Sequence, residues 1–172
     1  RDGLAVFHPP GSGHVFEVRI PGDRGTTHAG YFDDLDVAAA AVEGAACYGR
    51  NIYVTLNPVE PVLIKRAPNR LVERARALTV DSQVVRRRRL LLDFDPARPA
   101  RTAATDAELR AALGRRRQEV EGLAREGGWP EPVLIMSGNG GHAIYALDLE
   151  VTAATRDLVK AVLDALHRRF GD

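Results

Sequence analysis

The pattern of hydrophobic and polar residues changes near residue 83 and predicts two parts of different architecture. In the first part, residues 15–20 alternate as in a strand, and residues 51–56 have the β-branched and aromatic composition of another. Between them, residues 35–47 are rich in alanine and valine and follow Asp34, a good N-cap, which predicts a helix.

The segments between these elements carry weaker signals. Residues 23–30 are polar and predict a loop, whereas residues 57–68 hold three prolines and predict an extended connection. A short basic helix is expected over residues 69–78. The first part therefore predicts a small αβ module.

The second part begins with a strong strand signal over residues 84–95, apolar from Leu90 onward. Thr105 and Glu108 form a capping box that opens a long helix, and Gly127-Gly128 ends it. Four apolar residues are expected to form its inward stripe: Leu109, Leu113, Val120 and Leu123.

A hairpin and a last helix follow. Residues 133–136 predict a buried strand, residues 137–141 a tight connection, and residues 142–149 the returning strand. Thr152 opens the helix, and its inward stripe is expected to be Leu158, Val159, Val162, Leu163 and Leu166. The order strand, helix, strand, strand, helix supplies five of the six elements of the split βαββαβ unit. The chain is thus expected to be α/β, more specifically α+β, with parts at residues 1–83 and 84–172.

Composition narrows the class of protein only a little. The 172 residues suffice for one domain with a core or for a domain with a small appended module. A net charge of +1 gives no general argument for nucleic-acid binding. The single cysteine excludes an intrachain disulfide and a zinc site built on cysteines. No apolar stretch approaches membrane-spanning length, so a cytoplasmic protein without a membrane partner is expected.

Two carboxylates stand side by side where the apolar residues 90–92 end. Residues i and i+2 of a strand point to the same face, so Asp93 and Asp95 project together. Such a pair after a buried strand needs compensation by a cation or by arginines, and its oxygens suit a hard divalent cation. The alternative is an ordinary acidic strand end before Pro96. We favour metal binding, as in two-metal phosphoryl transfer.

A glycine-rich turn, Ser137-Gly-Asn-Gly-Gly-His142, follows the second apolar run. The same residues suit a plain hairpin, although a hairpin requires neither Ser137 nor His142. The glycines let backbone amides approach an anion, and the hydroxyl and imidazole can hold phosphate oxygens. Carboxylates for metal beside donors for phosphate predict a nucleotidyl-transfer site.

Arginine clusters are a third feature. Residues 115–117 lie on the predicted long helix and are expected to form a solvated face. Alternation places Arg87 and Arg89 on the face of the two carboxylates, where they could approach a triphosphate or a template phosphate. Three basic residues in the first part suit contact with a template backbone as well as they suit a solvated surface: Lys65, Arg66 and Arg70.

Together these motifs resemble the catalytic core of the archaeo-eukaryotic primase (AEP) superfamily, particularly the prokaryotic primase-polymerases of mobile elements and CRISPR-associated loci. Residues 53–59 (Tyr-Val-Thr-Leu-Asn-Pro-Val) and 66–70 (Arg-Ala-Pro-Asn-Arg) resemble its N-terminal module. Residues 86–96 resemble its first metal motif, and residues 137–142 resemble its nucleotide-binding motif. The resemblance covers nearly the whole chain, from about residue 16 to residue 170.

The resemblance implies an RRM-like, ferredoxin-like palm (residues 84–172) packed against a small N-terminal αβ module (residues 1–83). It implies template-dependent nucleotidyl transfer from NTPs or dNTPs, with Mg²⁺ or Mn²⁺ held by Asp93 and Asp95. It assigns the incoming nucleotide to Ser137, Gly138, Asn139, His142, Arg87 and Arg89. It assigns the DNA template, single-stranded or primer-template, to Asn57, Lys65, Arg66, Asn69 and Arg70.

The resemblance also predicts parts outside these residues. The family carries a third metal-binding aspartate on a strand after the last helix, and that strand is expected beyond residue 172. Arg1 is not an initiator methionine, so a longer protein is expected. A helicase or another replication or CRISPR protein, fused or associated, is an expected partner.

Two other functions compete with this interpretation. An RRM-like sheet can bind single strands through aromatic and arginine side chains without catalysis. The chain is only 6% aromatic, and its central strands offer Phe94 and Tyr145 without a stacking cluster, which disfavours this alternative. A nicking enzyme of the replication-initiator kind would need a His-x-His pair, which the sequence lacks.

Overall fold

A computed structural model of the chain describes residues 1–46, 51–96, 98–99 and 102–170. Its contacts divide the chain into two units. Unit 1 comprises Arg1–Arg88 with Asp148–Val151, and unit 2 comprises Arg89–Leu147 with Thr152–Asp172. The chain forms two three-stranded sheets flanked by helices, which confirms the expected mixed α and β class.

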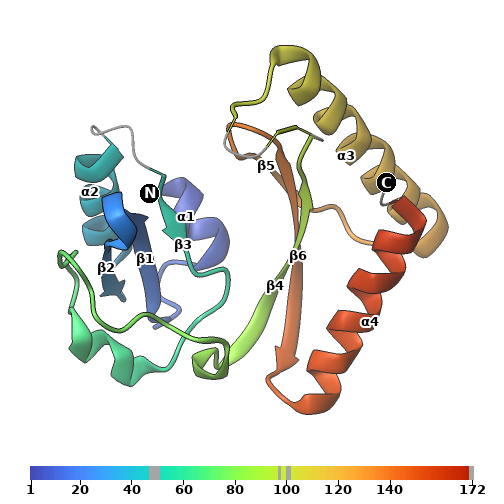
Figure 1. Ribbon diagram of the computed structural model, residues 1–172. Helices are drawn as coiled ribbons and strands as arrows, with labels where there is room; N and C mark the ends of the chain where they lie inside the picture. Colours follow the sequence, from blue (N-terminus) through green and yellow to red (C-terminus); the bar gives the residue numbers. More distant parts are fainter. Residues whose placement is uncertain (47–50, 97, 100–101, 171–172) are drawn as a thin grey trace. The chain divides into compact units, whose positions relative to one another are not determined.

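Unit 1 is built on the sheet β2-β1-β3, in which β1 pairs antiparallel with both neighbours. Its strands and helices are α1 (Asp2–Phe7), β1 (Phe16–Pro21), β2 (Thr27–Phe32), α2 (Leu35–Ala46) and β3 (Tyr53–Val54) (Figure 1). The predicted cap of α2 is confirmed, because Asp34 Oδ1 accepts hydrogen bonds from the amides of Asp36 and Val37. The apolar side of α2 packs in a core with Phe16, Val18 and Phe32. The predicted helix end at Cys47 lies outside the described residues.

Strand β2 corrects the loop predicted over residues 23–30. Residues 22–26 connect the strands and include the short 3-10 helix η1 (Asp23–Gly25), so the predicted loop holds up to residue 26. From Thr27 onward β2 pairs with β1, from Pro21↔Thr27 to Phe16↔Phe32. The polar residues in the first half of β2 predict a loop when considered alone. Backbone hydrogen bonds to β1 and the burial of Tyr31 and Phe32 hold the strand in the sheet.

The basic helix predicted over residues 69–78 is also wrong. Asn69 and Arg74 have positive φ angles of 47° and 51°, which a helix does not admit. Instead the segment lies along β2, where Ala29 and Val72 exchange backbone hydrogen bonds of 3.1 and 2.9 Å. The connection before it is not fully extended, since Pro61–Arg66 form the 3-10 helix η2. β3 keeps only two of the six residues predicted for its strand.

Gly30 lies where this segment approaches β2 most closely. A Cβ atom at this position would stand 2.0 Å from the carbonyl oxygen of Arg70 and 3.1 Å from the Phe32 ring. The close approach therefore requires glycine, because a backbone carbonyl cannot rotate out of the way.

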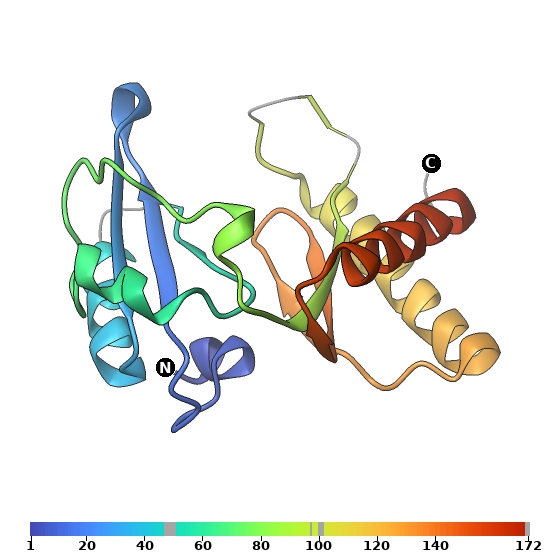
Figure 2. The ribbon, with the colours of Figure 1, turned by 90° about the horizontal axis from the view of Figure 1, so that it is seen from below.

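The second sheet has the strand order β4-β6-β5. Its elements are η3 (Asp81–Gln83), β4 (Arg86–Phe94), α3 (Asp106–Gly127), β5 (Val133–Met136), β6 (Gly141–Glu150) and α4 (Ala153–Phe170). Figures 1 and 2 show α3 and α4 on the same face of this sheet. Their apolar side chains enclose Leu90, Leu92 and Phe94 of β4 with Ala143 and Tyr145 of β6.

Helix α3 follows the sequence closely. Thr105 and Glu108 form the predicted capping box, and Gly128 ends the helix with a left-handed φ of 64°. Leu123 of the predicted stripe is buried and Val120 packs against the same core. Local signals thus suffice here, since caps and helical spacing involve only neighbouring residues.

β5 and α4 are more exposed than predicted. Val133, Leu134 and Met136 are 45%, 48% and 62% exposed, because β5 is an edge strand rather than a buried one. On α4, Val159 and Leu166 pack against the core as expected, whereas Leu158 and Leu163 are exposed. In the part of the chain that the structure describes, no helix combines the length and hydropathy needed to cross a membrane.

Candidate functional site

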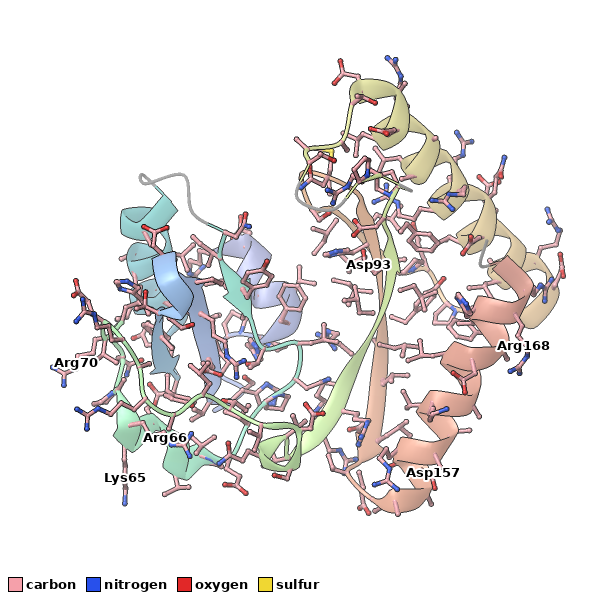
Figure 3. The ribbon with its side chains drawn as sticks, viewed as in Figure 1. Lys65, Arg66, Arg70, Asp93, Asp157 and Arg168 are labelled. Carbon is pink, nitrogen blue, oxygen red and sulfur yellow. The ribbon has the colours of Figure 1, made fainter. Side chains whose placement is uncertain are left out.

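Asp93 and Asp95 lie at the end of β4 and just after it. Leu90, Leu92 and Phe94 turn into the core beneath the helices, so alternation directs Asp93 to the opposite face of the sheet. The carboxylates are 54% and 57% exposed, and Figure 3 labels Asp93 on its strand. The apolar half of the strand thus fixes the direction of its acidic end.

The glycine-rich turn closes the hairpin between β5 and β6, which pair from Val133↔Ile144 to Met136↔Gly141. The Ser137 amide donates to the Gly140 carbonyl over 3.0 Å, and Ser137 Oγ accepts from the Gly140 amide over 3.0 Å. Gly138 has a φ of 94°, a conformation that glycine adopts readily. Asn139 Oδ1 accepts from the Ala104 amide over 3.1 Å, which ties the turn to the segment before α3.

The structure brings the two motifs into direct contact. His142 Nε2 lies 3.3 Å from Asp93 Oδ1. A Cβ atom on Gly140 would stand 2.6 Å from both Asp95 Oδ1 and the Phe94 carbonyl oxygen. Residues more than forty positions apart in the sequence therefore form one surface of carboxylate, imidazole and backbone groups.

Electrostatics at Asp93 favour a cation. Partial burial raises the pKa of Asp93, and the negative charge of Asp95 raises it further, while His142 and the Phe94 amide oppose the rise. A divalent cation would relieve the cost of keeping two neighbouring carboxylates ionised. Within the described ranges, no three His, Cys, Asp or Glu residues are grouped to hold a metal ion. The oxygen ligands of the pair would suit a hard divalent cation such as Mg²⁺ or Mn²⁺ as part of a ligand set.

Two arginines of α3 correct the solvated face predicted over residues 115–117. Arg115 Nη2 donates to the Asp95 carbonyl over 2.8 Å, and Arg116 Nη1 donates to the Ile135 carbonyl over 2.9 Å. Only Arg117 behaves as expected, in an exposed pair with Glu121. Helical spacing offered a signal, because position 116 falls between 113 and 120 on the apolar stripe.

Arg98 is a further residue that the sequence reasoning missed. Its Nη2 lies 4.0 Å from Asp95 Oδ2, and its side chain is only 19% exposed. A cationic group beside the second carboxylate could also meet an anionic ligand there. Its position in the irregular segment after β4 gave no periodic signal.

The four arginines at positions 86–89 of β4 differ in their contacts. Arg86 Nε and Arg88 Nη1 both contact Asp148 Oδ1 of β6, at 2.7 and 2.8 Å. Arg87 Nη1 is buried without a hydrogen-bond partner among the described residues. Alternation along the strand places Arg87 and Arg89 on one face of β4 and places Arg86 and Arg88, which bind Asp148, on the other face.

The residues assigned to the template all lie in unit 1. Asn57 Oδ1 accepts from the Arg88 amide over 2.6 Å, and Asn69 Nδ2 donates to Asp33 Oδ1 over 2.7 Å. Arg66 Nη1 donates to the Tyr31 hydroxyl over 3.1 Å, so it braces the fold as well as carrying charge. Lys65 and Arg70 extend away from the ribbon (Figure 3).

We expect the substitution Gly140→Ala to disturb both the carboxylate site and the packing of the turn against the end of β4. The added methyl would displace the Asp95 carboxylate, and a misplacement of about 1 Å can cost roughly 100-fold in rate. Nucleotide incorporation and thermal unfolding of the variant would be measured beside Gly114→Ala, whose Cβ on α3 meets nothing within 4 Å. Equal incorporation by the two variants would show that the contact of Gly140 with Asp95 is unimportant.

The chain was also compared with known proteins. No protein-family model, no curated protein and no solved structure matches it. Functional assignment therefore depends on the residues of the site and on the motifs they form.

Proposed function

We propose that the chain is the catalytic core of a DNA primase-polymerase, which transfers nucleotides to a growing strand under the direction of a template. One observation carries the proposal: the contact of Asp93 and Asp95 with the glycine-rich turn that ends at His142. The strand order β4-β6-β5 with two helices on one face supports an RRM-like palm, since it matches five elements of the split βαββαβ unit.

Each residue has a role that follows from its chemistry. Asp93 and Asp95 would hold Mg²⁺ or Mn²⁺, which activates the attacking 3′-hydroxyl and neutralises charge on the triphosphate. The turn would hold triphosphate oxygens through His142 and through amides other than those of Ser137 and Gly140, which donate within the turn. Arg87 and Arg89 would add positive charge. The 3′-hydroxyl would give up its proton to solvent and its oxygen would bond to the α-phosphorus, while the bond from that phosphorus to the bridging oxygen breaks and pyrophosphate leaves.

The template would run over unit 1, along Lys65, Arg66 and Arg70 with the amides of Asn57 and Asn69 nearby. Basic side chains provide affinity for phosphates that is independent of sequence and weakens with salt. The rival, a binding module that stacks bases on the second sheet, gains no support from Phe94 and Tyr145. They are 7% and 2% exposed, within the core of unit 2.

The test is nucleotide incorporation by the chain on a single-stranded template and on a primer-template, with Mn²⁺ or Mg²⁺ and with NTPs or dNTPs. The expected result is extension that requires the metal and stops with a chelator. Mn²⁺ binding, followed by electron paramagnetic resonance, gives a second readout that does not need turnover. If the protein neither binds Mn²⁺ nor incorporates nucleotides, the proposal is wrong.

We expect His142→Asn to weaken nucleotide binding by about 10-fold, because a hydrogen bond to a charged group contributes about 1.5 kcal/mol or more. Binding of a fluorescent nucleotide would be titrated with Mn²⁺ present. His28→Asn on β2 is the matched control, since this histidine belongs to unit 1 and has no assigned role in nucleotide or template binding. An unchanged nucleotide affinity in His142→Asn would count against the role of the imidazole.

A further inference from the structure

A cavity of about 320 Å³ opens in unit 1, and neither of the two carboxylates lines it. It is bounded by β3 with the residues after it, by the segment that precedes η3, and by one side chain of β1. Arg19, Tyr53, Asn57, Thr79, Val80 and Asp81 are among its lining residues. Of the residues assigned above to nucleotide or template, only Asn57 is among them.

The cavity has two hydrophobic side chains that are more than half exposed, beside the polar side chains of Arg19, Asn57 and Asp81. Tyr53 on the short edge strand β3 is 55% exposed, and Val80 on the facing segment is 57% exposed. An aromatic ring left open in a concave site suits a flat ring that can stack on it. The volume lies at the low end of small-molecule sites and suits a ligand the size of a nucleobase with its sugar.

Arg19 gives the cavity a cationic group that is held in place. Glu17 is 0% exposed. One of its carboxylate oxygens accepts hydrogen bonds from Arg19 Nε over 2.8 Å and from the Thr79 amide over 3.1 Å. Arg19 also donates to the Thr79 carbonyl. The buried carboxylate therefore fixes both the guanidinium and the wall at Thr79, and it pairs with the charge of Arg19, while Asp81 adds a second carboxylate to the lining.

The same wall is connected to the basic segment of unit 1. Thr79 Oγ1 lies 3.3 Å from the Tyr31 hydroxyl, to which Arg66 also donates, and Arg66 reaches the Leu78 carbonyl at 3.5 Å. Residues 65–76 carry five basic side chains and one acidic side chain. A chain of phosphates can thus pass from the cavity to a surface of matching charge.

We propose that this cavity binds one unpaired base of a single-stranded DNA, stacked on Tyr53, with the adjacent phosphates directed toward the basic residues 65–76. The identification of this DNA as the template rests on the proposed function, whereas the binding of a single strand does not. Stacking of a base on an aromatic side chain is tolerant of sequence, as a template site requires.

The test is binding of a fluorescein-labelled oligo(dT) strand to the chain by anisotropy, without metal or nucleotide. Tyr53→Ala should raise the Kd by about 10-fold, because stacking contributes about 1–3 kcal/mol per base. Tyr53→Phe should bind as the wild type does. Val62→Ala is the matched control, because Val62 is 57% exposed in the same unit but does not line the cavity.

Two further readouts separate stacking from general attraction. The slope of log Kd against log salt should be the same in Tyr53→Ala and the wild type, since the ring makes no ionic contact. Free dTMP should not displace the strand at concentrations near the Kd of the oligonucleotide. Displacement by dTMP at that level, an unchanged Kd in Tyr53→Ala, or no strand binding by the wild type would each overturn the assignment.

Failure of this assignment is distinguishable from failure of the proposed function. A protein that incorporates nucleotides but binds DNA equally well without the Tyr53 ring has a template site elsewhere. A protein that needs Tyr53 for strand binding but never incorporates nucleotides has the cavity without the catalytic activity.

Discussion

Replacing Asp93 and Asp95 together with asparagine is expected to abolish metal-dependent nucleotide incorporation. A bound divalent ion contributes several kcal/mol to a phosphoryl-transfer transition state, which corresponds to a loss of about 10³-fold or more. The loss should appear in kcat and in Mn²⁺ binding alike, because the amides cannot replace the charged oxygens as ligands. The assay is incorporation on a primer-template, with Mn²⁺ titrated separately.

The fold should survive this double substitution. The pKa of Asp93 is raised in the folded protein, so its ionised form destabilises the fold as the pH rises through the pKa. A neutral asparagine removes that penalty at neutral pH, and the melting temperature should stay the same or rise. Asp157→Asn on α4, an exposed carboxylate in Figure 3, is the control for activity. Undiminished incorporation by the double variant would rule out these carboxylates as the metal ligands.

Replacing Gly30 with alanine is expected to destabilise unit 1 by more than about 3 kcal/mol, beyond the usual range for an overpacked site. The new Cβ would stand 2.0 Å from the Arg70 carbonyl oxygen, which belongs to the backbone and cannot turn aside. Either β2 or the segment beside it must move, and the hydrogen bonds between Ala29 and Val72 would break. The measurement is the urea midpoint of unfolding.

Gly44→Ala is the matched control for Gly30→Ala. Gly44 lies in α2, and a Cβ there meets nothing within 4 Å. Alanine should stabilise this helix by about 0.5–1 kcal/mol, since glycine is the poorer helix former. Equal urea midpoints for the two variants would mean that the Arg70 carbonyl can move away from β2 without loss of stability.

Elements with strong local signals could be predicted from the sequence. The start of α3 depends on Thr105 and Glu108, and its end on Gly128, all of which act on their own turn of helix. β2 could not be predicted, because Thr27 and His28 become strand residues only through their pairing with β1. The exposure of β5 was missed for the same reason, since four apolar residues do not reveal whether their strand lies inside a sheet or at its edge.

The candidate site shows a similar division. Alternation predicted that the two carboxylates project together, and the turn chemistry predicted the hairpin that carries His142. The packing of Gly140 against Asp95 depends on the register of β6, which no local pattern specifies. The charge of Arg115 and Arg116 predicts a solvated face, but their long side chains reach carbonyl groups of Asp95 and Ile135.

The division of the chain into units has a consequence for dissecting the protein. Unit 1 is assembled from two stretches, because Asp148–Val151 belong with Arg1–Arg88 although unit 2 lies between them in the chain. A fragment that ends at residue 88 would keep Arg86 and Arg88 but lose Asp148, which binds both. Neither unit is thus available as one uninterrupted gene segment. A chimera that exchanges unit 1 would therefore have to exchange Asp148–Val151 at the end of β6 as well.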